Sequence, residues 1–347
     1  MKMQAARLYG KNDLRIEEVP VPEIGDEEIL VRVKAAAVCG TDFRMYSNGI
    51  PNADEKNPRI LCHEFAGVIE KTGSRVDTYK AGQRVSVAPN IGCGICDACV
   101  SGEGNNCSKI TTLGITFDGG FAEYVRIPKA AVMLGNVTLL EDNVSFEAAA
   151  ANEAFACVYN AYERYNIYPG DVVLIIGAGA IGLMHAQLAK MAGASKVLLN
   201  DISESRLVEC KKLEPSLICI KDDLEKRVLE ETNGKGANVV ITACSVASVQ
   251  QDALKYAGIN GRVNFFGGLP KGKENVELDT NIIHYKQIIL TGTTRSTLWH
   301  YRKTLSFIAA GLVDVDSMIT HKLKINEIQT AFENMTNAVG LKQVIVF

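Results

Sequence analysis

Four cysteines follow one another at short spacing in the first third of the chain. Cys93, Cys96, Cys99 and Cys107 are separated by three, three and eight residues. Zinc favours thiolate sulfur and takes four ligands at about 2.3 Å in a closed structural site. Glycines stand between these cysteines, and glycine lets the backbone turn tightly around one ion. The spacing therefore predicts a structural zinc site and argues against a disulfide framework.

A second, sparser set of metal-binding residue types lies upstream. Cys39 begins the segment Cys-Gly-Thr-Asp, and His63 and Glu64 follow it after a gap of twenty-four residues. A catalytic zinc needs three protein ligands and one open position. The chain has 5 histidines in all, so a histidine in this setting is informative. We expect a second, open metal site around Cys39 and His63.

A glycine pattern downstream indicates a nucleotide. Gly177, Gly179 and Gly182 follow an apolar run, where they permit a tight turn, close approach of pyrophosphate and helix packing. Asp201 lies nineteen residues after the last glycine, where its carboxylate would bind ribose hydroxyls and repel a 2′-phosphate. Arg206 is open to three interpretations: pairing with a phosphate, stacking beside adenine, or facing solvent. We expect NAD in preference to NADP.

These residues must be positioned by two kinds of structure. Up to about residue 150 the chain shows short alternating runs separated by turns, which predict an irregular, mainly β domain. From Ser145 to Tyr162 it is alanine-rich and compatible with a helix. Expected strands of both parts are 29–35, 65–69, 84–88, 172–176, 196–200, 238–242 and 262–266, with a helix at 181–192. The later alternation of strand and helix predicts an α/β, Rossmann-type doubly wound parallel sheet.

Bulk properties bound the possible functions. At 347 residues the chain exceeds the usual size of one core, which predicts two domains. The formal net charge of -3 provides no excess of positive charge for nucleic acid. The start of the chain lacks an apolar signal segment, and no apolar run is long enough to span a bilayer. We expect a cytoplasmic protein with reduced cysteines and no membrane partner.

Over essentially its whole length the sequence resembles the zinc-dependent medium-chain dehydrogenase/reductase family, specifically its polyol (sorbitol/L-iditol dehydrogenase-like) branch. The motifs described above carry the resemblance, together with Asp118-Gly-Gly-Phe-Ala-Glu-Tyr124. It implies a GroES-like zinc-binding catalytic domain over 1–155, a NAD-binding Rossmann domain over 156–290 and a return to the catalytic domain over 291–347. It also implies a homodimer or homotetramer.

The resemblance implies roles for the upstream residues. Cys39 and His63 would hold the catalytic zinc with one or both of Glu64 and Glu153, and Thr41 would pass the substrate proton toward the ribose. Glu153 stands where polyol enzymes have glutamate and enzymes of simple alcohols tend to have cysteine. Arg295 matches an arginine that holds a substrate hydroxyl. The implied cofactor residues are Gly177, Gly179, Ile181, Gly182, Asp201, Arg206, Gly267, Gly268, Leu269, Thr293, Thr294 and Arg295.

Three positions depart from the family pattern. Cys62 replaces the glycine that usually precedes the histidine, which places a further thiol beside the expected metal. Met45 replaces a substrate-binding tyrosine, so the pocket wall becomes more apolar or Tyr46 takes that role. Arg44 replaces a histidine that ends the proton relay, and a guanidinium cannot release a proton at neutral pH. We expect the proton to reach bulk water from Thr41 or from the ribose.

The expected activity is reversible, zinc-dependent and NAD-linked oxidation of a secondary hydroxyl of a polyol to the ketose, as in sorbitol or xylitol oxidation. Two alternatives use the same constellation: a polyol-phosphate dehydrogenase of the galactitol- or arabitol-phosphate type, and a threonine dehydrogenase. A third, of a different class, is a non-catalytic NAD-binding structural protein. The sequence does not name the polyol or its stereochemistry, because these depend on a pocket assembled from separate loops.

Overall fold

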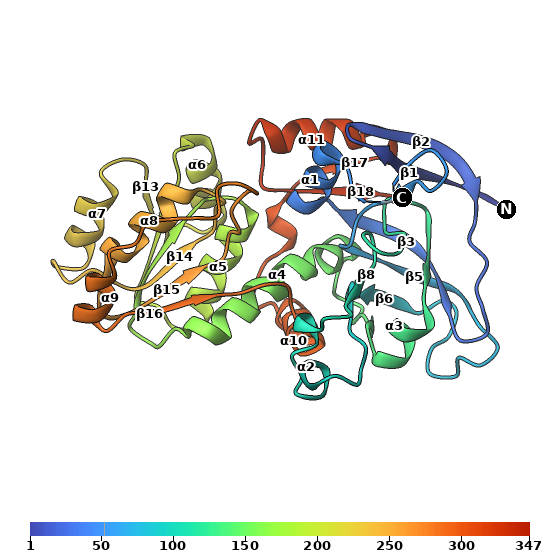
Figure 1. The fold of residues 1–347 in the computed structure, drawn as a ribbon, viewed down its shortest axis with the longest axis horizontal. Helices are drawn as coiled ribbons and strands as arrows, with labels where there is room; N and C mark the ends of the chain where they lie inside the picture. Colours follow the sequence, from blue (N-terminus) through green and yellow to red (C-terminus); the bar gives the residue numbers. More distant parts are fainter. Residues whose placement is uncertain (52) are drawn as a thin grey trace. The chain divides into compact units, whose positions relative to one another are not determined.

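The computed structural model describes residues 1–51 and 53–347. The chain divides into two compact units. Unit 1 contains Met1–Ala156, Arg295–Gly311 and Val315–Phe347, and unit 2 contains Cys157–Thr294 and Leu312–Asp314. The long helix α4 (Phe146–Tyr165) contributes residues to both units. Figure 1 shows the elements in chain order.

Unit 1 is built on β-sheets. A seven-stranded sheet has the order β10-β6-β5-β3-β18-β17, and β9 also pairs with β3. Smaller sheets, β2-β1-β4 and β7-β8, complete the described strands of this unit. The strands are β1 (Lys2–Gly10), β2 (Asp13–Pro20), β3 (Ile29–Ala37), β4 (Arg59–Ile60), β5 (Phe65–Thr72), β6 (Arg84–Val87), β7 (Asn90–Ile91), β8 (Thr111–Thr112), β9 (Tyr124–Ile127), β10 (Val137–Leu139), β17 (Ile319–Leu323) and β18 (Lys342–Val346).

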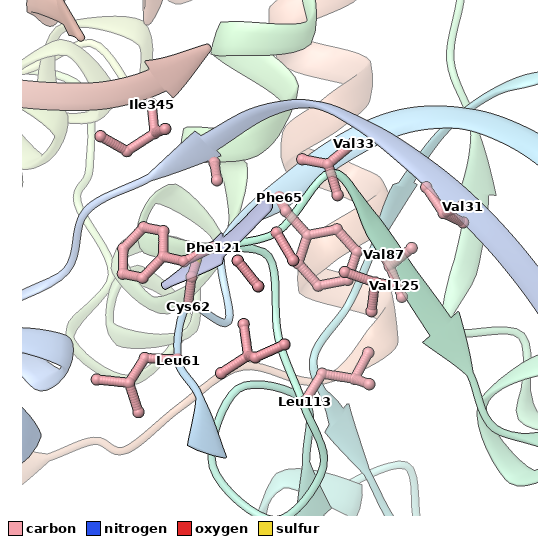
Figure 2. Close-up of a cluster of buried hydrophobic side chains, with 14 of the residues drawn as sticks. Val31, Val33, Leu61, Cys62, Phe65, Val87, Leu113, Phe121, Val125 and Ile345 are labelled. Atoms are coloured by element: carbon pink, nitrogen blue, oxygen red, sulfur yellow. The ribbon is translucent and has the colours of Figure 1, made fainter. Parts of the chain in front are cut away.

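Short helices connect these strands and carry several candidate site residues. They are α1 (Gly40–Asn48), α2 (Asp97–Val100), η1 (Gly104–Asn106), α3 (Lys129–Leu134), α10 (Leu298–Ala309), η2 (Asp316–Met318), η3 (Ile325–Glu327) and α11 (Ile328–Thr336). The core of unit 1 lies where the strands bury their apolar faces. Figure 2 shows Phe65, Phe121 and Leu113 in this core, with Cys62 among them.

Unit 2 contains a six-stranded parallel sheet with the order β13-β12-β11-β14-β15-β16. This is the doubly wound order in which the first strand lies near the middle. The strands are β11 (Val172–Ile176), β12 (Lys196–Asn200), β13 (Ile218–Ile220), β14 (Ala237–Thr242), β15 (Ala257–Phe265) and β16 (Ile289–Gly292). The helices are α5 (Ala180–Met191), α6 (Glu204–Leu213), α7 (Leu224–Glu231), α8 (Ala247–Tyr256) and α9 (Thr280–Lys286).

The apolar strands explain the parallel sheet. β11 reads Val-Val-Leu-Ile-Ile and buries four of its five residues, as expected for a strand covered on both faces. The predicted α/β class and the parallel Rossmann-type sheet are therefore confirmed. The ends of the two expected helices differ by one to three residues, because α4 runs from Phe146 to Tyr165 and α5 from Ala180 to Met191. None of the helices in the described residues is long and apolar enough to cross a membrane.

Candidate active site and metal centres

The first turn of α1 positions Cys39. This residue is the N-cap of the helix, with extended backbone, and its sulfur accepts a hydrogen bond from the Thr41 amide at 3.5 Å. The carboxylate of Asp42 completes the capping box by accepting from the Cys39 amide at 3.0 Å. The cap therefore fixes the direction in which the Cys39 sulfur points.

Asp42 also reaches the segment that carries His63. Its Oδ1 accepts a hydrogen bond from the Cys62 amide at 3.1 Å and lies 3.6 Å from Nδ1 of His63. The side chain of Asp42 is fully buried. The carboxylate of Asp42 thus links the two segments that bear Cys39 and His63, and it faces Nδ1 of the imidazole. Such partners commonly orient a metal-binding histidine.

Cys62 occupies an unusual backbone conformation. Its φ of 78° lies in the left-handed region that favours glycine, the residue expected at this position from the family pattern. The thiol donates to the carbonyl oxygens of Glu64 at 3.3 Å and Ala37 at 3.5 Å, and burial raises its pKa well above the usual value. It is therefore directed into the core (Figure 2) and lies outside the metal-binding group described next.

A close backbone contact explains one glycine of the Asp118-Gly-Gly motif. A Cβ at Gly119 would lie 2.0 Å from the carbonyl oxygen of Cys62, so a side chain is excluded there. The neighbouring Gly120 amide donates to that same oxygen at 2.8 Å. This motif therefore supports the backbone just before His63.

The side chains of Cys39, His63 and Glu64 come together. Each offers one ligand atom, and these atoms all lie within 4.8 Å of one another. Sulfur, imidazole nitrogen and carboxylate oxygen form a donor set that suits zinc, with three protein ligands. Oε1 of Glu64 is buried and has no hydrogen-bond partner among the described residues, which fits a carboxylate that faces an ion. The residues therefore fit the metal that the sequence predicts.

Electrostatics at this group favour a cation. Burial by itself lowers the pKa of His63, but the negative groups of Cys39 and Asp42 outweigh it and raise the pKa well above its usual value. The imidazole would thus bind a proton in the absence of a metal. A metal ion supplies the same positive charge and leaves the imidazole neutral.

A buried lysine neutralises Glu64. Nζ of Lys342, the first residue of β18, lies 2.6 Å from Oε2 of Glu64 and donates to the carbonyl oxygen of Val38 at 3.1 Å. Burial lowers the pKa of Lys342, yet the charge of Glu64 outweighs it and keeps the pKa above its ordinary value. Lys342 therefore keeps its proton beside Glu64 in the interior.

Glu153 lies close to this group without belonging to it. It is in α4 and is 7% exposed. Burial, the largest influence, lowers the pKa of Lys342 and raises that of Tyr301, and the charge of Glu153 contributes to raising both pKa values. The group of three ligand atoms within 4.8 Å does not include its carboxylate. Among the described residues, Glu64 is thus the glutamate whose carboxylate joins the ligand atoms of Cys39 and His63 within 4.8 Å of one another.

The residues after Thr41 on α1 have separate surroundings. Nη2 of Arg44 donates to Oγ1 of Thr41 at 3.0 Å. Met45 is buried in the core of unit 1. The ring of Tyr46 stacks on Phe332 of α11, with centroids 5.0 Å apart. Arg44 is thus the residue of this turn that reaches the proposed relay hydroxyl.

The four-cysteine segment forms the second metal group. The sulfur atoms of Cys93, Cys96, Cys99 and Cys107 lie within 4.8 Å of one another, around the short helices α2 and η1. Backbone amides of Ile95 and Cys96 lower the pKa of Cys93 to about 6. The sulfur of Cys107 accepts from the amides of Cys93 and Lys109, each at 3.4 Å. The amides that lower the pKa of Cys93 favour the thiolate form that zinc binds.

Arg295 contacts this segment. It directly follows unit 2 in the chain and has a positive φ of 56°. Its Nη1 donates to the carbonyl oxygen of Asn105 at 3.3 Å, between Cys99 and Cys107. The structure thus places the predicted substrate arginine against the loop of the four-cysteine site.

The predicted cofactor residues follow the carboxyl ends of parallel strands. Ile176, Asn200, Thr242, Phe265 and Gly292 are paired across the sheet at these ends. The carboxyl ends of parallel strands share one edge, which is where ligands of doubly wound sheets bind. The segments that follow them are Gly177–Gly182, Asp201–Arg206, Gly267–Leu269 and Thr293–Thr294.

Hydrogen bonds shape the glycine turn. Oδ2 of Asp201 accepts from the Ala178 amide at 2.7 Å, and its Oδ1 accepts from the Ser203 amide at 2.8 Å. A Cβ at Gly182 would lie 1.8 Å from the Gly177 carbonyl oxygen, so this position requires glycine. Nε of Arg206 is buried and has no hydrogen-bond partner among the described residues. The turn and the acidic residue are thus in contact at the strand ends.

Two residues of the catalytic group escaped the sequence analysis. Asp42 had a local signal, because an acidic residue three positions after Cys39 fits a capping box. Lys342 had none, since nothing near it in the sequence indicates a buried partner for Glu64. Its role depends on β18 pairing with β3 in the middle of the sheet.

The comparison with known families agrees with both parts of the fold. The family described as "Alcohol dehydrogenase GroES-like domain" matches residues 25–136, and "Zinc-binding dehydrogenase" matches residues 180–310. The fold and the donor groups thus define an oxidoreductase of the zinc-binding dehydrogenase class.

Curated relatives extend over nearly the whole chain. Sorbitol dehydrogenase of Bacillus subtilis is 33% identical over 335 residues, covering 95% of this chain and 93% of the relative. L-Threonine 3-dehydrogenase of Rhizobium etli is 32% identical, with coverages of 96% and 94%. L-Galactonate-5-dehydrogenase of Escherichia coli is 32% identical, with coverages of 95% and 94%. The chain belongs to the zinc-dependent medium-chain dehydrogenase family, in the branch that contains the sorbitol dehydrogenases.

Solved structures share the fold along the entire chain. A zinc-binding dehydrogenase fold from Sinorhizobium meliloti, bound to NADP, has a TM-score of 0.90 at 28% identity and covers 100% of both chains. An alcohol dehydrogenase from Escherichia coli complexed with NADH has a TM-score of 0.89 at 26% identity, with coverages of 100% and 99%. The two neighbours bind different forms of the cofactor, so the choice must be argued from the residues of this chain.

Proposed function

We propose that this chain is a zinc- and NAD-dependent dehydrogenase that oxidises a secondary hydroxyl of a polyol to a ketone, reversibly. The observation that carries the proposal is the grouping of Cys39, His63 and Glu64 within 4.8 Å. The glutamate at position 153, the residue type that the polyol branch has there, and the identity to a sorbitol dehydrogenase support the substrate class.

In the proposed mechanism Cys39 and His63 would hold the catalytic zinc with Glu64 or Glu153. When bound, zinc supplies Lewis-acid polarisation of the alcohol oxygen, and NAD supplies the carbon that accepts hydride. Oγ1 of Thr41 takes the hydroxyl proton and passes its own proton on to the ribose or to water. Asp42 holds the imidazole of His63 in place throughout the reaction. The four-cysteine group would hold a zinc that stabilises the fold.

We propose NAD as the preferred cofactor because of Asp201. Its carboxylate follows β12 at the strand edge and already contacts the glycine turn through Ala178. An ionised carboxylate there accepts ribose hydroxyls and repels a 2′-phosphate. Ile181 and Gly182 lie in the first turn of α5, where the helix end attracts pyrophosphate. Nε of Arg206 is buried, so the terminal N–H groups of its guanidinium would be the ones to contact the adenosine part of NAD.

Two further features concern the oligomeric state and the compartment of the protein. β16 is the edge strand of the sheet in unit 2, and Ile289 on it is 57% exposed. An exposed apolar edge strand can pair with a second copy, which supports the expected homo-oligomer. All ten cysteines are unpaired, which suits a reducing compartment such as the cytoplasm.

The test is NADH formation by the zinc-loaded protein on free C4 to C6 polyols, with NADP in parallel. Cys39→Ala should lower turnover at least about a thousandfold, roughly 4 kcal/mol of barrier, and remove one of two zinc ions per chain. A matched control is Cys157→Ala, which keeps both metal groups. Full turnover by Cys39→Ala, or no turnover of any polyol by the zinc-loaded wild type, would contradict the proposal.

A further inference from the structure

Arg44 places a positive charge beside the proposed proton acceptor. Residues 41 and 44 lie three apart on α1, so their side chains share one face of the helix. Nη2 of Arg44 donates to Oγ1 of Thr41 at 3.0 Å, while the amide of Thr41 donates to the sulfur of Cys39. The guanidinium is thus one hydrogen bond from the hydroxyl that would contact the reacting alcohol.

This guanidinium has no carboxylate partner. Among the described residues Arg44 makes its single hydrogen bond to Thr41 and no ion pair within 4.0 Å, and it is exposed. Other arginines of the chain do have a carboxylate oxygen within that distance: Arg7, Arg15, Arg32, Arg59, Arg75, Arg126, Arg227 and Arg262. Arg44 therefore differs from these eight arginines, each of which has a carboxylate partner.

The acidic groups nearby already have partners. Asp42 accepts from the amides of Cys39 and Cys62 and faces His63, and Glu64 is paired with Lys342 at 2.6 Å. The site therefore does not need Arg44 to neutralise its own carboxylates. Four further N–H donors of the guanidinium remain after the bond to Thr41, in the forked arrangement that binds carboxylate or phosphate oxygens in pairs.

We propose that Arg44 is a substrate-binding residue, and that the substrate is a polyol bearing an oxyanion group, a carboxylate or a phosphate, close to the hydroxyl that is oxidised. This inference rests on the function proposed above and narrows its substrate class. The curated relatives include an L-threonine 3-dehydrogenase, whose named substrate carries a carboxylate near the hydroxyl at position 3. Arg44 would bind the oxyanion of the substrate, and its hydrogen bond to Thr41 would keep the guanidinium at a fixed distance from the hydroxyl that accepts the proton.

The experiment compares three six-carbon substrates with the zinc-loaded protein and NAD. Galactitol is neutral, L-galactonate carries a carboxylate, and galactitol 1-phosphate carries a phosphate. Wild type should have a kcat/KM at least about tenfold higher for one of the two anions than for galactitol, and the preferred anion identifies the group. Arg44→Gln should lower that value by about tenfold to a hundredfold, as expected for a lost charge-assisted hydrogen bond.

Two variants separate binding from a structural effect. Arg44→Gln should lower kcat/KM for the preferred anion at least about tenfold more than kcat/KM for galactitol, because only the anion loses a charge-assisted hydrogen bond. Arg44→Lys should retain part of the preference because it keeps the charge without the fork. Arg32→Gln is the matched control, since it removes one exposed positive charge from the same unit, where Arg32 pairs with Glu70. It should leave the preference unchanged.

A binding measurement provides a readout that is independent of turnover. The alcohol cannot react in the complex with NADH, so calorimetric titration of each compound into the protein–NADH complex gives its affinity directly. The preferred anion should bind more tightly than galactitol, and added salt and Arg44→Gln should each weaken that difference.

The outcomes distinguish the two proposals. Equal use of neutral and anionic compounds, or an equal effect of Arg44→Gln on both, would overturn the role of Arg44 and leave a polyol dehydrogenase. Oxidation of free C4 to C6 polyols but of neither anion would likewise overturn the role of Arg44 alone. Oxidation of none of the three compounds and of none of the free polyols, by protein that carries two zinc ions and binds NADH, would overturn the proposed function and the inference together.

Discussion

At the scale of single residues, the catalytic group contains two buried pairs of opposite charge. Asp42 faces His63 and Lys342 lies against Glu64, while the first turn of α1 holds the sulfur of Cys39. Both pairs are buried, where an unmatched charge is costly. The group is therefore sensitive to the removal of either partner of a pair.

Lys342→Met tests this sensitivity. It should lower the free energy of unfolding by about 3–5 kcal/mol, because Glu64 keeps a buried charge without its partner. Denaturant titration of the zinc-loaded protein measures the change. Adding Glu64→Gln to the variant should restore part of the loss. Lys322→Met is the control, since Lys322 is 53% exposed and its pair with Glu147 should contribute less than about 1 kcal/mol. A similar small loss in Lys342→Met would contradict the role of the buried pair.

At the scale of elements, the buried side chain of His185 links α5 to its neighbours. His185 lies in the middle of this helix, is fully buried, and its Nδ1 is 3.0 Å from the hydroxyl of Tyr165 at the end of α4. Its ring also meets Phe266 edge to face, with centroids 4.8 Å apart. α5 is the helix that begins in the glycine turn, so this contact anchors the element that positions the proposed pyrophosphate site.

The titration of His185 gives a pH-dependent prediction. Burial lowers its pKa to about 3, against about 6.5 in the unfolded chain. Between these two pKa values only the unfolded state binds the proton. The contribution of His185 to the free energy of unfolding is therefore complete above about pH 6.5. Below that it declines by about 1.4 kcal/mol per pH unit. The difference in unfolding free energy between wild type and His185→Leu should therefore shrink from pH 6.5 to 4.5. A constant difference would contradict this prediction. His284→Gln, at an exposed position, is the control for the removal of a histidine.

The elements also show how far sequence reasoning extended. The apolar run of β11 and the glycine turn predicted a strand, a helix and their order, because local pattern decides them. The grouping of Cys39 with His63 followed from ligand chemistry. The pairing of Glu64 with Lys342 could not be predicted, because it depends on β18 being inserted beside β3, a contact without any local pattern. The packing of Tyr46 on Phe332 likewise depends on α11, which is distant in sequence.

At the scale of the whole molecule, the two kinds of site belong to different units. Both metal groups lie in unit 1, whereas the glycine turn, Asp201 and the loops after β15 and β16 lie in unit 2. Arg295 is the one predicted cofactor residue assigned to unit 1. Metal binding and cofactor binding should therefore be separable in solution.

Removal of zinc with a chelator tests this separation. The metal-free protein should bind NADH with a Kd within about threefold of the loaded protein, while its Tm falls by about 10 °C, because the four-cysteine zinc contributes folding free energy. Asp201→Ala should instead raise the Kd for NADH at least about tenfold and change Tm little. Fluorescence titration and calorimetry measure both quantities. A tenfold weaker Kd for NADH after zinc removal would show that the sites depend on each other.

The position of β18 has a consequence for biosynthesis. This strand lies between β3 and β17 in the central sheet of unit 1, yet it follows all of the large segment of unit 2 along the chain. In a nascent chain emerging from the ribosome, residues 35–37 of β3 therefore lack their β18 partner, and Glu64 lacks its lysine, until residues beyond 340 have been translated. Unit 2 has most of its sequence available earlier. The amino-terminal half of this dehydrogenase should thus be the part that needs a chaperone during synthesis, although it is made first.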